Sequence, residues 1–160
     1  MNFGFKGIHH IAISVPSLSD AKTFYVDKLG FEIVDEDQFP PSQEMDMVMG
    51  LQGADCHMMM VNAGNLLLEI FEFHSPGQSD QESPRPLSDH GYTHLAFEVE
   101  DIQVAYEYLS TAGVSWHQPP AEAGEGYMMA YGRDPFGNVI EIQQLVGGLP
   151  YSFDHLSLPH

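Results

Sequence analysis

The 160-residue sequence carries 23 acidic and only five basic residues, which gives a formal net charge of −18. This charge excludes nucleic acid and an anionic membrane surface as the main partner, because phosphate groups are bound by clustered Lys and Arg. Apolar residues make up 43%, enough for a folded core, and no apolar run approaches the ~20 residues of a membrane span. The single cysteine, Cys56, and an N-terminus without a signal-peptide pattern predict a cytoplasmic protein.

The chain contains an internal repeat. The segment GIHHIAISV at 7–15 aligns with GYTHLAFEV at 91–99, and GNLLLEI at 64–70 aligns with GNVIEI at 137–142 after one deletion. Each half therefore begins with a segment that carries a His and ends with a segment that carries a Glu. We interpret this pattern as the duplication of one module.

In the first half, β-branched and apolar residues predict a strand over residues 8–15. A helix follows, with Ser17 and Ser19 as candidate caps and Gly30 at its end. Three further strands are predicted, over residues 31–35, residues 45–49 or 56–61, and residues 66–73.

The second half repeats this order. A strand is predicted over residues 93–99, and a helix runs from near Asp101 to Gly113. Three further strands are predicted over residues 114–117, 127–131 and 139–145. The unit is therefore βαβββ, used twice, and the predicted fold class is α+β.

The domain organisation follows from these elements. We expect a single domain over residues 1–160, built of two modules at 7–74 and 91–146. Residues 75–90, rich in Pro and Ser, are predicted to link the modules, and residues 147–160 form a tail without a clear period.

Strand alternation separates ligand-type residues from the core. Ile11 and Ile13 share one face of the first strand, and His10 falls on the other. Glu69 interrupts an apolar run and falls on the face opposite Leu68 and Ile70. Burying a carboxylate without a partner destabilises the folded state by several kcal/mol. Imidazole and carboxylate together suit Zn, Ni, Co, Mn or Fe(II). The repeat therefore predicts a divalent-metal site with the ligands His10, Glu69, His94 and Glu141, although a His on a strand is more often structural.

Other residues are candidates for a substrate pocket. Phe71 and Phe73 share the face of Glu69 and are predicted to line it. Tyr131 and Arg133 precede the turn DPFGN and are predicted to contact substrate, with turn stabilisation beside Asp134 as the alternative. Either a flexible apolar pocket or packing in a core or dimer interface is predicted for six methionines, Met45, Met47, Met49, Met58, Met59 and Met60.

Five segments resemble the vicinal oxygen chelate superfamily, also called the glyoxalase/bleomycin-resistance/extradiol-dioxygenase group. They are HIAISV at 10–15, the Phe-Tyr to Leu-Gly-Phe stretch at 24–31, LEIFE at 68–72, HLAFEVEDI at 94–102 and DPFGNVIE at 134–141. The resemblance covers nearly all of residues 7–146. It implies curved, mixed sheets that form a cup around a metal, with helices on the outer face and ligands at the four positions named above. It also implies a homodimer, and the sequence leaves open whether a site lies within one chain or is shared.

The ligand set narrows the activity that the resemblance implies. His, Glu, His and Glu together are similar to glyoxalase I, and epimerases of the methylmalonyl-CoA type are also similar, although they commonly carry Gln in place of Glu69. A lyase or isomerase acting through a metal-stabilised enolate is expected, with Glu141 as base and Glu69 as a ligand that can also move a proton. The scarcity of basic residues disfavours glutathione and acyl-CoA substrates and favours a small oxygenated molecule. The alternatives are an extradiol-type dioxygenase and a non-enzymatic small-molecule binding or resistance protein.

Overall fold

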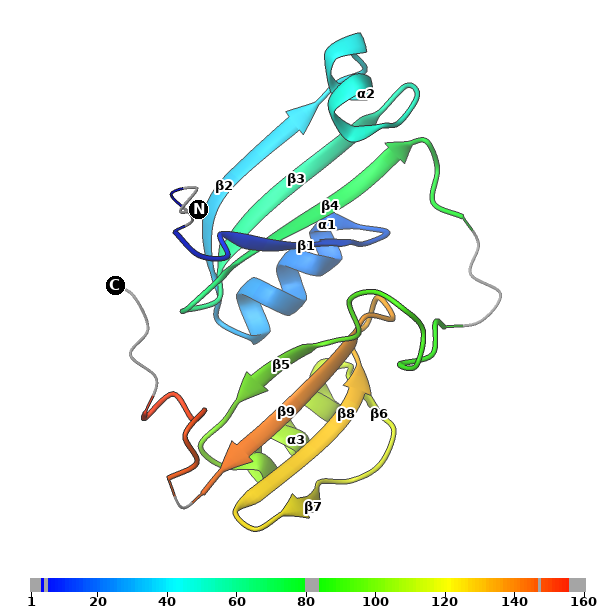
Figure 1. The fold of residues 1–160 in the computed structure, drawn as a ribbon. Helices are drawn as coiled ribbons and strands as arrows, with labels where there is room; N and C mark the ends of the chain where they lie inside the picture. The colour runs from blue at the N-terminus through cyan, green and yellow to red at the C-terminus, as the bar shows by residue number, and fades with distance from the viewer. Residues whose placement is uncertain (1–3, 5, 80–83, 147, 156–160) are drawn as a thin grey trace. The chain divides into compact units, whose positions relative to one another are not determined.

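The computed structural model describes residue 4 and residues 6–79, 84–146 and 148–155. The chain divides into two compact units, Met1–Asp80 and Gln81–His160. Each unit contains one sheet with a helix on one of its faces (Figure 1), so the predicted α+β class with two βαβββ modules is confirmed. The prediction that both units form one domain stays a prediction.

The first unit is built on a four-stranded sheet of order β1-β4-β3-β2. Its strands are β1 (His10–Ser14), β2 (Glu32–Phe39), β3 (Asp55–Asn62) and β4 (Leu67–Ser75). Strand β1 runs parallel to β4, and the other neighbours are antiparallel. Figure 1 shows the long strands β2, β3 and β4 curving together.

A helical segment covers one face of this sheet. It begins as α1 (Leu18–Ala21) and continues as the π-helix η1 (Lys22–Lys28). The Ser17 side chain accepts from the backbone N–H of Asp20, as its predicted role as a cap requires. Phe24 and Tyr25 are buried together with Ile70 of β4, so this face of the sheet carries the core.

One predicted strand is a helix. Residues 45–49, offered as an alternative strand, lie in α2 (Gln43–Met49). The Ser42 side chain accepts from the N–H of Met45, and Gly50 ends the helix at a φ of 68°. The alternative over residues 56–61 falls in β3 instead. Met45, Met47 and Met49 therefore lie on a helix and not on a strand, and Met47 is 77% exposed.

The second unit has a sheet of order β5-β9-β8-β6, with β7 paired to β8. Its strands are β5 (Leu95–Glu98), β6 (Ser115–Trp116), β7 (Ala121–Gly124), β8 (Tyr127–Arg133) and β9 (Val139–Leu145). The helix α3 (Ile102–Ala112) is capped by the Asp101 carboxylate, which accepts from two backbone N–H groups, and it ends at Gly113 with a φ of 108°. No helix in the described parts of the chain is long and apolar enough to cross a bilayer.

Strand β7 was not predicted. Its sequence, Ala-Glu-Ala-Gly, lacks the β-branched and aromatic residues that mark strands, and all four residues are exposed. The strand forms because its backbone pairs with β8, with Ala121 opposite Met129. The two strands form a hairpin around residues 125–126, so the backbone of β8, and not the side chains of β7, defines this strand.

Candidate metal and substrate site

Each sheet has a helix-covered face and an opposite face, which we call the site face. In the first unit, alternation along β4 puts Leu68 and Ile70 in the core and Glu69 on the site face. The register places Ala12 of β1 and Met60 of β3 beside Glu69. A small side chain at Ala12 leaves space next to the carboxylate.

His10 and Glu69 form a pair on the site face of the first unit. The His10 Nε2 lies 3.4 Å from Oε2 of Glu69. The side chain of His10 is 41% exposed and that of Glu69 is 17% exposed. The second ring nitrogen, Nδ1 of His10, lies 2.9 Å from Nδ1 of His9. This pair is therefore open on its outer side.

His94 and Glu141 form the equivalent pair in the second unit. Nε2 of His94 lies 3.1 Å from Oε2 of Glu141, and the Glu141 side chain is only 3% exposed. The Thr93 hydroxyl lies 2.8 Å from Nδ1 of His94 and fixes the ring from its other nitrogen. A hydrogen bond at the second nitrogen is the usual way in which a ligating imidazole is oriented.

Two tyrosines of β8 hold Glu141. The Tyr127 hydroxyl donates to Oε1 of Glu141 over 3.0 Å. Burial and, next, the hydrogen bond to Glu141 raise the pKa of Tyr127 to about 12, and the same two causes raise the pKa of Tyr131 further. Both phenols therefore stay protonated and act as donors at neutral pH. The Tyr131 ring also meets the His94 ring edge to face, with centroids 5.1 Å apart.

The four predicted ligands thus come as two pairs, one in each unit. Two donors bound to one ion at ~2.0–2.2 Å are about 3 Å apart, so both His–Glu separations fit a shared ion. Among residues 4, 6–79, 84–146 and 148–155, no three His, Cys, Asp or Glu side chains gather into a metal-holding group. A single site with all four ligands stays a prediction.

The two phenylalanines predicted to line a pocket lie on the site face of the first unit. Phe71 and Phe73 stack with ring centroids 5.4 Å apart. Their cross-strand partners on β3 are Met58 and Cys56. Burial, with smaller contributions from nearby carboxylates, raises the pKa of the Cys56 thiol and keeps it protonated. This face thus presents a continuous apolar wall beside Glu69.

Arg133 is the last residue of β8, directly before the turn to β9. Its guanidinium donates to the carbonyl oxygens of Gly137, over 2.6 Å, and of Arg85, over 2.8 Å. These contacts support the alternative role, stabilisation of the turn. A contact between Arg133 and a substrate stays a prediction.

His74 lies near the end of β4, the strand that carries Glu69. Its Nε2 lies 3.1 Å from Oε1 of Glu72, and its ring packs against that of His57. Glu72 also accepts from the backbone N–H of Leu18, at the start of α1. These residues therefore belong to the helix-covered side of the sheet, away from Glu69.

Sequence reasoning missed three residues around Glu141. Thr93 and Tyr127 contact the His94–Glu141 pair directly, and Gln143 shares the Tyr127 hydroxyl over 3.1 Å. Alternation along residues 127–131 already put Tyr127 on the face of Tyr131. Only the register of β8 against β9 shows that this face meets Glu141.

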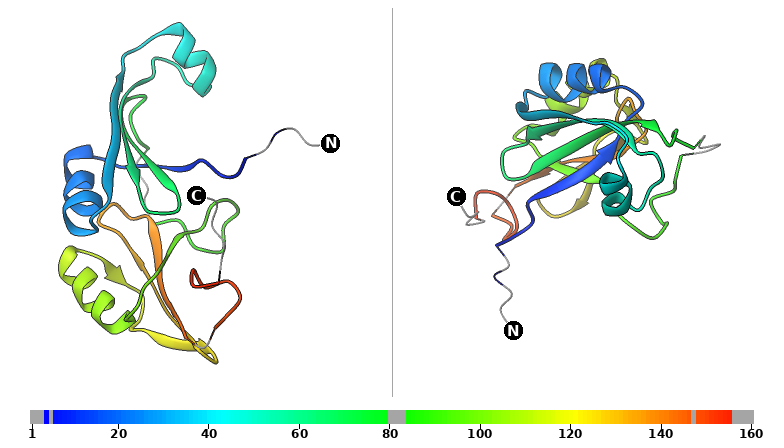
Figure 2. Two further views of the ribbon diagram at one scale, coloured as in Figure 1. Left: turned by 90° about the vertical axis from the view of Figure 1, so that its left-hand side faces the viewer. Right: turned by 90° about the horizontal axis from the view of Figure 1, so that it is seen from above.

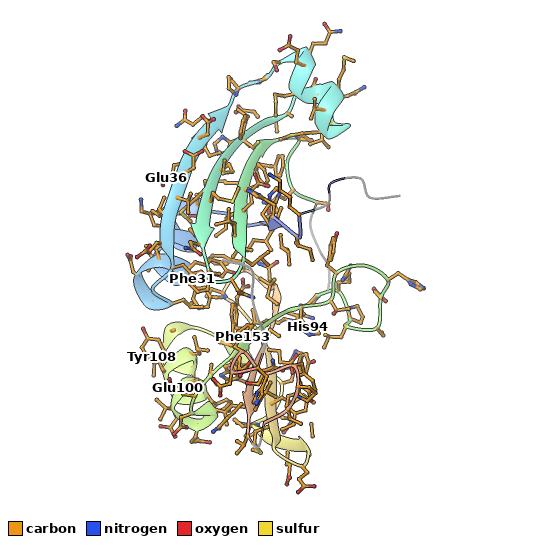
Figure 3. The ribbon with its side chains drawn as sticks, turned by 60° about the vertical axis from the view of Figure 1, so that its left-hand side comes forward. Phe31, Glu36, His94, Glu100, Tyr108 and Phe153 are labelled. Atoms are coloured by element: carbon orange, nitrogen blue, oxygen red, sulfur yellow. The ribbon has the colours of Figure 1, made fainter. Side chains whose placement is uncertain are left out.

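The segment after β9 also reaches the site face of the second unit. Within the predicted tail at 147–160, residues 148–155 are described, and Ser152 is 3% exposed. The Ser152 hydroxyl and the Phe153 N–H both donate to the carboxylate of Glu98, over 2.6 and 3.0 Å. Figure 2 shows α3 and this segment on opposite sides of β9, and Figure 3 labels Tyr108 on α3 and Phe153 on this segment.

The profile of the Glyoxalase/Bleomycin resistance protein/Dioxygenase superfamily matches residues 7–142. The chain belongs to this superfamily. Among curated proteins, it is similar to a 2-epi-5-epi-valiolone epimerase from an Actinomyces species, with 30% identity over 92% of this chain and 84% of the relative.

Solved structures share the fold. A glyoxalase family protein from Bacillus cereus superimposes with a TM-score of 0.79 at 21% identity, covering 89% of this chain and 96% of the other. A glyoxalase family protein from Enterococcus faecalis gives a TM-score of 0.62 at 29% identity, covering 88% of this chain and 99% of the other.

Proposed function

We propose that this protein is a metal-dependent lyase or isomerase that acts on a small oxygenated substrate by proton transfer beside a carbonyl group. The observation that carries the proposal is the pair of His–Glu contacts at equivalent positions of the two units. Similarity to an epimerase over most of the chain supports a proton transfer that inverts a carbon centre. Epimerisation is therefore the form of the reaction to test first.

The donor set fits a divalent ion. His10, Glu69, His94 and Glu141 would hold it through two imidazole nitrogens and two carboxylates, which suit Zn, Ni, Co, Mn or Fe(II). When bound, such an ion supplies a Lewis acid that stabilises negative charge on a substrate oxygen. The small side chain of Ala12, beside Glu69 in the sheet, leaves room for a ligand.

The proton is moved by the protein's carboxylates. Glu141 is assigned as the base because it is buried beside His94 and held by the Tyr127 hydroxyl, which fixes its direction. Glu69 has a more exposed histidine partner and is assigned as a ligand that can also exchange a proton. Phe71 and Phe73 would shield the reacting carbon from water.

Metal analysis and solvent-exchange measurements test the proposal together. Protein purified without chelator is expected to carry a stoichiometric divalent metal, and to catalyse deuterium uptake from D₂O beside the carbonyl of hydroxyketones. Glu141→Gln should lower this exchange by about 10²–10⁴-fold while the fold survives, as loss of a general base does. The matched control is Glu125→Gln, in the exposed turn before β8.

Two results would contradict the proposal. A protein without bound metal would support a binding or resistance module instead. Oxygen consumption with catechols and no deuterium uptake would support an extradiol-type dioxygenase. We also propose a homodimer located in the cytoplasm, and light scattering of the purified protein measures the oligomeric state.

A further inference from the structure

A hollow of about 320 Å³ lies in the second unit next to Tyr131. This volume is at the lower end of the ~300–1,000 Å³ range of ligand pockets, so it suits a small molecule. The lining consists of the loop residue Leu87, the strand residues Met129, Ala130 and Tyr131, and the segments at 117–119 and 121–123.

The hollow adjoins the His94–Glu141 pair through one side chain. Tyr131 lines the hollow, packs its ring against His94 and lies directly opposite Glu141 in the pairing of β8 with β9. The backbone N–H of His117 donates to the carbonyl of Tyr131 over 2.8 Å, which places His117 opposite Tyr131 at the same strand position. A molecule in the hollow would therefore lie against Tyr131, the cross-strand neighbour of the carboxylate assigned as the base.

The chemistry of the lining selects against anions. Leu87, Pro119 and Met129 offer apolar surface, whereas the polar lining residues are His117, Gln118, Glu122 and Tyr131. No lysine or arginine belongs to this lining in the described part of the chain. The nearby Arg85 and Arg133 donate to backbone carbonyls. A phosphate or carboxylate in the hollow would lose its hydration and find Glu122, a like charge, in place of a cation.

We infer that the hollow binds the part of the substrate that does not react, and that this substrate is a small, uncharged, hydroxylated carbonyl compound with a compact carbon skeleton. Its apolar carbons lie against Leu87 and Met129, and its hydroxyl groups bond to His117 and Gln118. A glutathione adduct or a coenzyme A thioester does not fit, because neither its anionic groups nor its length is accommodated. This inference rests on the proposed function.

The binding test uses three probes on the full-length, ¹⁵N-labelled protein. 2-Hydroxycyclohexanone should shift the amide signals of His117, Met129 and Tyr131 saturably. Dihydroxyacetone should shift the same signals more weakly because it has less apolar surface to bury. Dihydroxyacetone phosphate should bind at least tenfold more weakly than dihydroxyacetone. Equal or tighter binding of the phosphate by the wild-type protein overturns the inference.

Two variants locate the binding. Ala121→Trp fills the hollow from β7 and should weaken 2-hydroxycyclohexanone at least tenfold, whereas Glu125→Trp, in the exposed turn outside the hollow, should not. Gln118→Arg supplies the missing cation and should raise affinity for dihydroxyacetone phosphate at least fivefold, whereas Gln103→Arg on α3 should not. An unchanged affinity in Ala121→Trp overturns the inference.

The outcomes separate this inference from the proposed function. If the protein binds metal and catalyses deuterium uptake, but Ala121→Trp leaves the KM for 2-hydroxycyclohexanone unchanged, the proposed function stands and the hollow is not part of the substrate site. If the probes shift the signals of His117 and Tyr131 saturably, but the protein neither binds metal nor catalyses deuterium exchange, the inference that the hollow binds a substrate is overturned. The hollow would then be a binding site alone.

Discussion

The hydroxyl of Tyr127 is shared between two side chains of β9. It lies 3.0 Å from Oε1 of Glu141 and 3.1 Å from Oε1 of Gln143. Since burial keeps this phenol protonated, with a pKa of about 12, the hydroxyl acts as a donor throughout the physiological range. Glu141 is thereby oriented from one side while His94 meets its other oxygen, Oε2.

This arrangement makes Tyr127 a positioning residue for the proposed metal ligand Glu141. Replacement by Phe removes the donor and keeps the ring in place. Because partners of metal ligands typically contribute 10–100-fold to metal affinity, Tyr127→Phe is expected to weaken binding of a divalent ion by about that factor. Calorimetric titration of the metal-free protein with Zn²⁺ or Co²⁺ measures the change.

The control for this prediction is Tyr92→Phe, since the Tyr92 side chain is 91% exposed. That variant should bind metal like the wild type. Unchanged metal affinity in Tyr127→Phe would mean that the Tyr127 hydroxyl only provides a hydrogen bond to Gln143 and Glu141 in the folded unit and does not position Glu141 for metal binding.

Glu72 links β4 to the first turn of α1. Its carboxylate accepts from the backbone N–H of Leu18 over 2.8 Å, and this bond, followed by the contact with His74, lowers the pKa of Glu72. A lowered folded-state pKa means that the stabilisation is complete above the unfolded-state pKa, about 4.3, and is lost as the pH falls through the folded-state value.

Glu72→Gln keeps an acceptor for Leu18 but removes the charge. We expect the free energy of unfolding to fall by about 0.5–1 kcal/mol at pH 7, as for charges at helix N-termini, and the difference to be smaller at pH 3. Urea unfolding at both pH values measures it, with Glu32→Gln on the exposed side of β2 as control. A difference that grows toward acid pH would contradict the assignment.

Much of the fold could be predicted from local signals. Ser17 and Asp101 cap the two helical segments, and Gly30 and Gly113 follow their ends, as expected from the short-range chemistry of helix termini. The methionine-rich residues 45–49 are an alternative for a predicted strand, and the structure has a helix there. Periodicity in five residues does not separate a strand from a helix turn, and the cap at Ser42 decided the outcome.

The site could be predicted only as far as the repeat reaches. The duplication marked the residues of both His–Glu pairs, and the structure brings each pair together. Thr93 and Tyr127 have no such signal, because their roles depend on the rotamer of His94 and the register of β8 against β9. The buried Ser152 was unpredictable for the same reason, since its partner Glu98 lies 54 residues earlier.

Asp134 stabilises the turn between β8 and β9. It is 4% exposed, and its carboxylate accepts from the N–H groups of Phe136 and Asn138 and from the Asn138 side chain. Asp134→Ala leaves these donors without their acceptor, so we expect a loss of about 2–4 kcal/mol in the free energy of unfolding. Thermal and urea unfolding check this value, and the exposed Asp27→Ala is the control. A loss below 1 kcal/mol would mean that water replaces the carboxylate.

The segment 148–155 is attached to the second unit through Glu98. Ser152 donates to Oε1 and Phe153 to Oε2, and the Tyr151 ring meets that of Tyr127 with centroids 6.5 Å apart. Removing one donor to a charged acceptor costs ~1.5–3 kcal/mol. Ser152→Ala is therefore expected to raise local opening of the segment about tenfold or more, while the unfolding midpoint changes little.

Hydrogen exchange measures this opening directly. Amide exchange over residues 148–155, and at Phe153 in particular, should accelerate in Ser152→Ala and in Glu98→Gln, whereas Ser115→Ala on the exposed β6 should leave it unchanged. If the segment also shields Tyr127, Ser152→Ala should bind metal more weakly than wild type but more tightly than Tyr127→Phe. Equal exchange rates in all variants would show that Tyr151 and Phe153, through apolar packing, hold the segment without the Glu98 bonds.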